Sequence, residues 1–195
     1  MNLPNRLTLT RMILAPVLFC WFFASDFIRG LPVALYCIVL ALLYATIELT
    51  DLIDGKIARK RQLVTDLGKV MDPFADVMCH ITFFTCFVAS SIMPVWAFMI
   101  ILWRELLQCF MRMLLMGKGK AMPANIFGKS KTCLYAFTSI MGLVARIMAV
   151  CSASQNWMCI LMVVLSGLSA LASAVSFIIY LYNTFKSGVL STMTR

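Results

Sequence analysis

Four aspartates, Asp51, Asp54, Asp72 and Asp76, have the residue type and the spacing to do chemistry. They are half of the 8 acidic residues in a chain that is 62% hydrophobic. A carboxylate beside hydrocarbon is costly, so a cluster of carboxylates needs a compensating cation. Mg²⁺ and Mn²⁺ prefer hard oxygen ligands of this kind. The cluster therefore predicts a site for one or two Mg²⁺ or Mn²⁺ ions.

Helical spacing explains how the four side chains could meet. Asp51 and Asp54 are three residues apart and Asp72 and Asp76 are four apart, so each pair shares one face of a helix. A short polar segment separates the pairs, which makes the two helices antiparallel neighbours and places the pairs at the same depth. The alternative is a buried charge network that only pins the two helices, but such a network does not require four aspartates.

The rest of the chain predicts an integral membrane protein. Charged residues make up 13% of its 195 residues, whereas a soluble domain has about 25%. Six hydrophobic segments approach or exceed the ~20 residues that cross a bilayer. They cover roughly residues 8–25, 31–54, 70–92, 94–116, 132–151 and 157–182. We expect an all-α fold of one domain over residues 1–195, with six transmembrane helices and a short interfacial helix at residues 2–11.

Basic residues set the expected orientation. With a cytoplasmic N-terminus, the cytoplasmic side holds most of the 17 Lys and Arg residues, and the loops on the opposite side hold Arg29 alone. This asymmetry is typical of the positive-inside rule, and it places the aspartates at the cytoplasmic end of the second and third helices. The net charge of +9 therefore indicates a membrane surface rather than nucleic acid as the partner.

The aspartates belong to a longer pattern, Asp51-x2-Asp54-Gly55-x2-Ala58-Arg59-x8-Gly68-x3-Asp72-x3-Asp76. At all eight fixed positions this pattern resembles the signature of the CDP-alcohol phosphotransferase family. The resemblance implies a six-helix membrane fold that is usually a homodimer, with an active site open to the cytoplasmic leaflet. It also implies the reaction, in which an alcohol oxygen attacks the β-phosphorus of a CDP-linked substrate and CMP leaves.

The family pattern implies a role for each fixed position. Asp76 is the catalytic base, and it shares metal binding with Asp51, Asp54 and Asp72. The residues expected around CDP are Asp51, Gly55, Ala58, Arg59, Gly68 and Asp72. A metal on the diphosphate offsets charge on the departing CMP, and a carboxylate takes the proton of the attacking alcohol.

Three further segments resemble one branch of the family, the bacterial phosphatidylglycerophosphate synthases. They are residues 3–11, Arg104-Glu105 with Arg112, and residues 128–132. The resemblance implies that the substrates are CDP-diacylglycerol and glycerol 3-phosphate. It also implies a multi-pass protein of the bacterial inner membrane, with the active site facing the cytoplasm.

Basic residues are expected to hold the acceptor, because glycerol 3-phosphate is a small dianion. Arg112, Lys129 and Lys131 are the candidates for this clamp, since Arg binds phosphate through two nitrogens and Lys as a point charge. Attraction to lipid headgroups is the alternative for the two lysines. Arg104 and Glu105 are instead expected to form an internal ion pair.

Two other ionisable residues have open assignments. Arg146 lies in the fifth hydrophobic segment, where we expect it to pair with Glu48 or Glu105. His80 is the only histidine and lies one turn after Asp76. It either supports that aspartate or packs in the interior without a role in the chemistry.

One position departs from the phosphatidylglycerophosphate synthase pattern. Val77 follows Asp76 directly, where those enzymes have a lysine. This leaves open another alcohol, such as inositol phosphate or serine, or the reaction of CDP-choline or CDP-ethanolamine with diacylglycerol. A cation transporter is the alternative from another class. The cluster lies at one end of the helices, however, and we find no inverted repeat.

Overall fold

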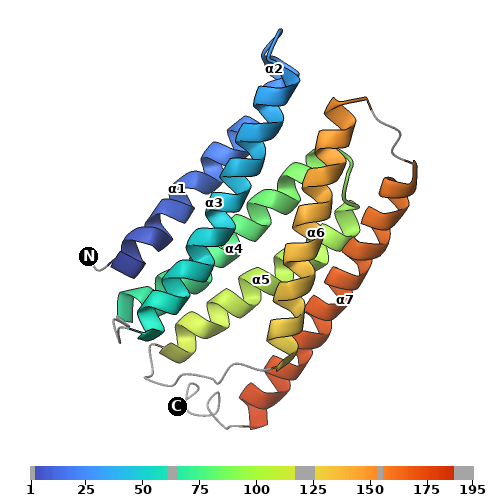
Figure 1. Cartoon of the computed structure of the whole chain (residues 1–195). Coiled ribbons are helices and arrows are strands. Elements are labelled where there is room, and N and C mark those ends of the chain that lie inside the picture. The colour runs from blue at the N-terminus through green and yellow to red at the C-terminus, as the bar shows by residue number, and fades with distance from the viewer. Residues whose placement is uncertain (1–2, 61–65, 117–125, 153–155, 187–195) are drawn as a thin grey trace.

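The structure is a computed structural model that describes residues 3–60, 66–116, 126–152 and 156–186. Six long helices and one short helix form within these ranges (Figure 1). They are α1 (Leu3–Phe22), α2 (Ala24–Phe27), α3 (Val33–Lys60), α4 (Asp66–Ala89), α5 (Val95–Met116), α6 (Ile126–Val150) and α7 (Asn156–Lys186). The expected all-α fold is confirmed, and the six long helices overlap the six predicted segments.

Local sequence signals set several helix ends. Pro32 and Pro94 come directly before α3 and α5, where a missing N–H group is tolerated. Their carbonyl oxygens accept the first bonds of those helices, from the N–H groups of Tyr36 at 3.0 Å and Phe98 at 3.3 Å. Ser91 follows the end of α4 with a φ of 58°. A left-handed residue is typical just beyond a helix C-terminus, and it turns the chain toward α5.

Four stretches are long and apolar enough to cross a membrane, judged by length and composition over the described residues. They are Asn5–Phe27, Val33–Asp51, Ser130–Val150 and Asn156–Lys186. α4 and α5 are not among them, and these two helices carry some of the charged residues of the polar clusters described below, such as Asp76 on α4 and Glu105 on α5. The described structure therefore supports a multi-pass membrane protein with at least four apolar spans.

The short interfacial helix expected at residues 2–11 is wrong as a separate element. α1 runs without a break from Leu3 to Phe22. Asn5, Thr8 and Arg11 are buried and continue the same helical face as buried Ala15. This face packs against both α3 and α4. An interfacial helix would place these residues against lipid headgroups, whereas Thr8 and Arg11 bond acidic side chains of α3 and α4.

α4 contacts α1, α5 and α6 and so links the two halves of the described bundle. Phe83, Phe84 and Phe87 on α4 are at most 1% exposed and form the middle of the apolar core. Gly142 on α6 lets that helix approach closely, because a Cβ atom there would lie 2.4 Å from the Phe87 ring. Close packing through small residues is a common way for membrane helices to associate.

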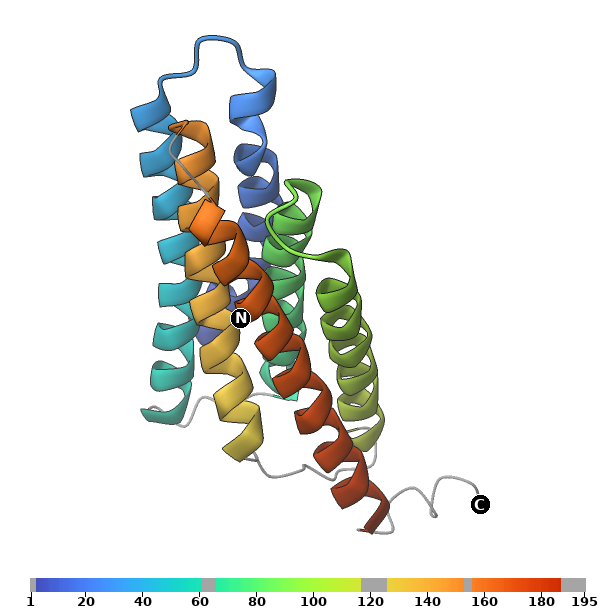
Figure 2. The ribbon, with the colours of Figure 1, turned by 90° about the vertical axis from the view of Figure 1, so that its right-hand side faces the viewer.

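The order of the helices places the aspartate signature and the start of α6 at one end of the bundle. α3 and α5 end there, and α4 and α6 begin there, while the connections from α2 to α3 and from α4 to α5 lie at the opposite end (Figure 2). The aspartate signature therefore lies at the same end as the start of α6. This agrees with the predicted common depth of the two aspartate pairs.

Candidate functional site

Three helices bring acidic and basic side chains together where α3 ends and α4 begins. Arg11 of α1 donates from Nη1 to Asp51 Oδ1 of α3 and to Asp76 Oδ1 of α4, the second contact at 2.8 Å. Thr8, one turn before Arg11, donates from its hydroxyl to Asp72 Oδ1 at 2.7 Å. One carboxylate from each predicted pair therefore converges on Arg11, and the prediction that the pairs face each other is confirmed for Asp51 and Asp76.

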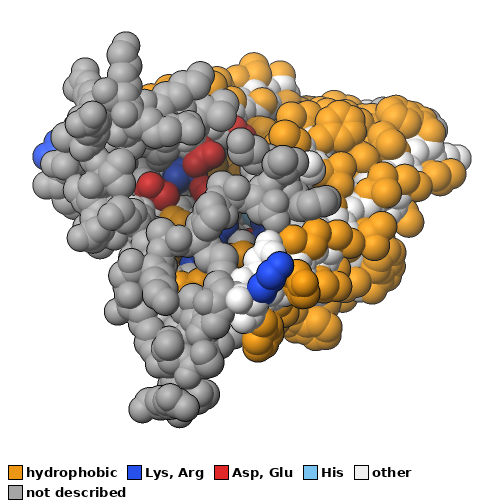
Figure 3. All heavy atoms as spheres, turned by 90° about the horizontal axis from the view of Figure 1, so that it is seen from below, with side chains coloured by type: hydrophobic (Ala, Val, Ile, Leu, Met, Phe, Trp, Pro, Cys, Tyr) orange, Lys and Arg blue, Asp and Glu red, His pale blue; other side chains and the backbone are white. Residues whose placement is uncertain are grey.

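Burial differs between the cation and its partners. The Arg11 side chain is 2% exposed, whereas those of Asp51 and Asp76 are 44% and 47% exposed. Seen from this end, acidic side chains surround a basic one in a hollow (Figure 3). The two carboxylates are thus open on one side, where a ligand can reach them, while the guanidinium lies beneath.

Part of the predicted site lies outside the described residues. The side chains of Asp54, Ala58, Arg59 and Lys129 belong to this part, as does Gly55. Gly68 is described and is buried near the start of α4. It lies one turn before Asp72.

The chemistry of the donors fits a divalent cation. Asp51 and Asp76 each place an oxygen on the same Arg11 nitrogen, so two helices aim carboxylates at one cation position. Hard carboxylate oxygens are the ligands that Mg²⁺ and Mn²⁺ prefer. Among the described residues no group of three acidic, His or Cys side chains is close enough to hold an ion. A complete ligand set would therefore draw on Asp54, whose side chain is not described.

Glu48 adds a further carboxylate to this end of α3. It lies one turn before Asp51 and is partly buried. Its charge acts on the same group of side chains, with Asp51, His80 and Arg11 all within electrostatic range. Glu48 was considered in the sequence analysis only as a partner for Arg146, so its place beside the aspartate cluster was missed.

His80 connects the aspartate cluster to the interior. Its Nδ1 lies 2.8 Å from the backbone oxygen of Asp76, one turn earlier on α4. Its ring packs 5.4 Å from the ring of Tyr135 on α6. Of the two assignments left open by the sequence, the geometry favours packing, because the ring contacts the main chain of Asp76 rather than its carboxylate.

A second polar cluster surrounds Glu105 on α5. Glu105 Oε1 accepts from Arg104 at 2.9 Å, from Lys131 at 2.5 Å and from the Tyr135 hydroxyl at 3.0 Å. The Glu105 side chain is 6% exposed, so these three bonds lie away from solvent. Arg104 also donates to Ser176 of α7 at 3.0 Å. The predicted ion pair between Arg104 and Glu105 is confirmed.

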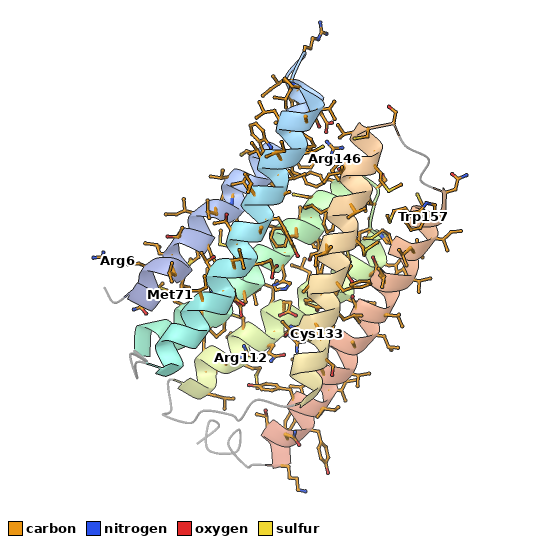
Figure 4. The ribbon with its side chains drawn as sticks, in the orientation of Figure 1. Arg6, Met71, Arg112, Cys133, Arg146 and Trp157 are labelled. Carbon is orange, nitrogen blue, oxygen red and sulfur yellow. The ribbon has the colours of Figure 1, made fainter. Side chains whose placement is uncertain are left out.

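Two residues of the predicted acceptor clamp, Arg112 and Lys131, are described, whereas the side chain of Lys129 is not. Lys131 is bound to Glu105 and lies 4.6 Å above the Tyr135 ring. Arg112 is exposed two turns after Arg104, and its charge acts on Lys131 (Figure 4). The geometry therefore places two of the three candidate residues near each other, at the same end of the bundle as the aspartates.

Comparison with known proteins decides the family. The profile of the CDP-alcohol phosphatidyltransferase family matches residues 1–175. The chain belongs to this family. The match includes α1, the two aspartate helices and the Glu105 cluster, so the described sites all lie within the family region.

Several individual relatives carry the same enzyme name. The chain is similar to "CDP-diacylglycerol--glycerol-3-phosphate 3-phosphatidyltransferase" of Bacillus subtilis, with 35% identity over 67% of this chain and 70% of the relative. The Aquifex aeolicus protein of the same name is 29% identical over 95% of this chain and 97% of the relative. The Treponema pallidum protein of that name is 42% identical, but the match spans 54% of this chain and 49% of the relative.

A third group of polar contacts, around Arg146, lies at the opposite end of the bundle. The partner predicted for Arg146 is corrected there. Arg146 does not pair with Glu48 or Glu105. Its Nη2 donates to both carboxylate oxygens of Asp26 at 2.8 Å, and its Nε donates to the Tyr36 hydroxyl at 3.1 Å. α6 ends at Val150, so Arg146 is one turn from the helix end and its long side chain reaches the α2 segment (Figure 4).

Sequence reasoning missed Arg11 and Thr8 as members of the aspartate site. A weak signal was present, since the two residues are three apart and so share one face of α1. They also lie within residues 3–11, the segment that resembles phosphatidylglycerophosphate synthases. Nothing in the sequence indicated which aspartates they would contact.

Proposed function

We propose that the chain transfers a phosphatidyl group from CDP-diacylglycerol to glycerol 3-phosphate and releases CMP. The observation that carries this proposal is the convergence of Asp51 and Asp76, from facing helices, on one cation position within a region that matches the family. The enzyme name shared by the relatives supports the choice of substrates.

Asp51, Asp54, Asp72 and Asp76 would hold one or two Mg²⁺ or Mn²⁺ ions, which neutralise charge on the diphosphate and on departing CMP. Asp51 and Asp72 also border the nucleotide, together with Gly55, Ala58, Arg59 and Gly68. Asp76 accepts the proton of the attacking hydroxyl. The new bond joins that oxygen to the β-phosphorus, while the bond from this phosphorus to the bridging oxygen breaks and its electron pair leaves with CMP.

Arg112, Lys129 and Lys131 bind the phosphate of the acceptor in this proposal. Support comes from the position of Lys131, which lies in the second turn of α6 at the same end as the aspartates and within range of the Arg112 charge. Glu105 holds the Lys131 ammonium in place at 2.5 Å. A lysine held in this way can donate its remaining N–H groups to a phosphate oxygen.

The membrane arrangement is also proposed. Six transmembrane helices form a single domain over residues 1–195, which assembles as a homodimer in a bacterial inner membrane with the aspartates facing the cytoplasm. The concentration of basic residues at the aspartate end supports this orientation. Apolar side chains that are more than half exposed, such as Trp103 on α5 and Ile178 on α7, support contact with lipid along the bundle.

A different acceptor is the second candidate function, and Val77 is the observation that favours it. An acceptor panel discriminates between the two. Purified protein with Mg²⁺ and CDP-diacylglycerol receives glycerol 3-phosphate, inositol phosphate or serine separately, and CMP release is followed. CDP-choline with diacylglycerol forms a further arm. CMP release with another alcohol, and none with glycerol 3-phosphate, would overturn the assignment.

The role of Asp76 has its own test. Asp76→Asn removes the proton acceptor and should lower turnover by at least about 100-fold, while CDP-diacylglycerol binding is largely retained. Asp26→Asn is the matched control, because it is the same substitution at the opposite end of the bundle. The control should keep near-normal turnover. Near-normal turnover of Asp76→Asn itself would show that Asp76 is not the base.

A further inference from the structure

The guanidinium of Arg11 occupies the point where the two facing carboxylates meet. One nitrogen, Nη1, donates to Oδ1 of both Asp51 and Asp76. These partners are 40 and 65 residues away in the sequence, so the contact depends on the assembled bundle. Charge-assisted bonds of this kind are among the stronger hydrogen bonds in proteins.

The packing of α1 fixes the point at which the Arg11 side chain leaves its helix. Thr8, Ala15 and Leu18 lie on the same face of α1 as Arg11, and each is at most 1% exposed. The Thr8 hydroxyl bonds Asp72, the next aspartate along α4. These contacts fix how α1 is aligned along α3 and α4. This alignment places Arg11 beside the aspartates.

We propose that Arg11 is an internal cation that competes with the divalent ion for Asp51 and Asp76 and, once displaced, binds the diphosphate of the nucleotide. The inference rests on the proposed function, because it takes these aspartates as metal ligands. Two cations cannot share the same oxygens at full strength, since like charges at contact distance repel. A buried guanidinium released from its carboxylates needs another anion, and the diphosphate is the anion that the same site receives.

Competition predicts effects of opposite sign on two ligands. Arg11→Gln removes the competing charge, so Asp51 and Asp76 are available to the metal in a larger fraction of molecules. The dissociation constant for Mn²⁺ alone should therefore fall about tenfold. The same variant lacks the diphosphate partner, so the dissociation constant for CDP at saturating Mn²⁺ should rise about tenfold. A purely structural Arg11 would instead weaken the binding of both ligands.

The experiment measures both constants on the full chain in detergent micelles, with Mn²⁺ binding followed by electron paramagnetic resonance and CDP binding by calorimetry. Arg6→Gln is the matched control, because it removes the same charge from the same helix at an exposed side chain that points away from the bundle (Figure 4). Its two constants should match those of the unchanged protein. Far-UV circular dichroism and a single elution peak check the fold of each variant.

Arg11→Lys keeps the test available if Arg11→Gln does not fold. A lysine retains the charge, but its single nitrogen reaches less far, so both constants should move in the same directions by a smaller factor. Unchanged or weaker Mn²⁺ binding in the variants would overturn the competition, and unchanged CDP binding would overturn the transfer to the diphosphate. Failure of the unchanged protein to bind either Mn²⁺ or CDP would instead refute the proposed function.

Discussion

Glu105→Gln tests whether one carboxylate holds the second polar cluster together. The substitution keeps the volume of the side chain and removes its charge. Glu105 Oε1 accepts from Arg104, Lys131 and Tyr135 at distances between 2.5 and 3.0 Å, and its side chain is 6% exposed. Two cations, with side chains that are 5% and 12% exposed, would lose their shared anion.

The expected loss is large because the cluster is buried. Removing one partner of a buried ion pair typically lowers the free energy of unfolding by about 3–5 kcal/mol. For a chain of this length each kcal/mol lowers the melting temperature by roughly 2–4 °C, so a fall of about 6–20 °C is expected. Thermal unfolding in detergent micelles, followed by tryptophan fluorescence, measures this shift.

Two comparisons make this test specific. Asp26→Asn removes the carboxylate partner of Arg146, but the Asp26 side chain is 47% exposed, so the loss should be about 1 kcal/mol or less. The double variant Glu105→Gln, Lys131→Met removes one anion and one cation, and it should lose less than the sum of its single variants. A loss below about 1 kcal/mol for Glu105→Gln, or additive losses in the double variant, would refute the reasoning.

Two further predictions concern packing and hydrogen bonding. Gly142→Ala should lower the free energy of unfolding by about 1–3 kcal/mol, since the new methyl group would overlap the buried Phe87 ring, and Gly167→Ala, with 3.4 Å of space to Trp96, should be nearly neutral. Tyr36→Phe should lower the free energy of unfolding by about 1–3 kcal/mol, because the buried Tyr36 hydroxyl donates to the Phe22 oxygen and accepts from Arg146. Tyr182→Phe is the control and should change this free energy little, because the Tyr182 side chain is 65% exposed. Melting temperatures measure both pairs, and equal shifts within either pair would contradict the structural account.

The lengths of the apolar segments predicted the long helices well, because they depend on the residues of each segment and not on its contacts with other segments. The predicted segment at residues 94–116 matches α5, which covers Val95–Met116. Larger differences arise where polar residues extend a helix beyond its apolar part. The segment predicted to end at residue 54 continues to Lys60 in α3, and α4 begins at Asp66 rather than at residue 70. A prediction from hydropathy leaves out these polar turns at the end of α3 and the start of α4, although the helical conformation continues through them.

The partners of the charged residues were harder to predict. Spacing along one helix shows which residues share a face, and it correctly indicated that Asp51 and Asp76 would meet. It does not show which residue of a third helix lies opposite that face, so Arg11 was missed. The Arg146 prediction failed for a related reason, because the choice of Glu48 or Glu105 assumed a partner within the spans. Asp26, in a segment expected to be a loop, reaches Arg146 at 2.8 Å.

The two polar clusters at the aspartate end are connected through contacts of Tyr135 on α6. Asp76 and His80 lie on α4, the His80 ring packs on Tyr135 of α6, and Tyr135 donates to Glu105 of α5 at 3.0 Å. Phe84 of α4 also packs edge-on against Tyr135, with ring centres 5.4 Å apart. Buried polar groups tolerate little displacement, because each lost hydrogen bond leaves an unsatisfied group away from water. α4 packs directly against both α5 and α6, so both contacts set the separation between Asp76 and the Glu105 cluster. A change that moves Tyr135 is expected to disturb His80 and Glu105 together, because Tyr135 contacts both.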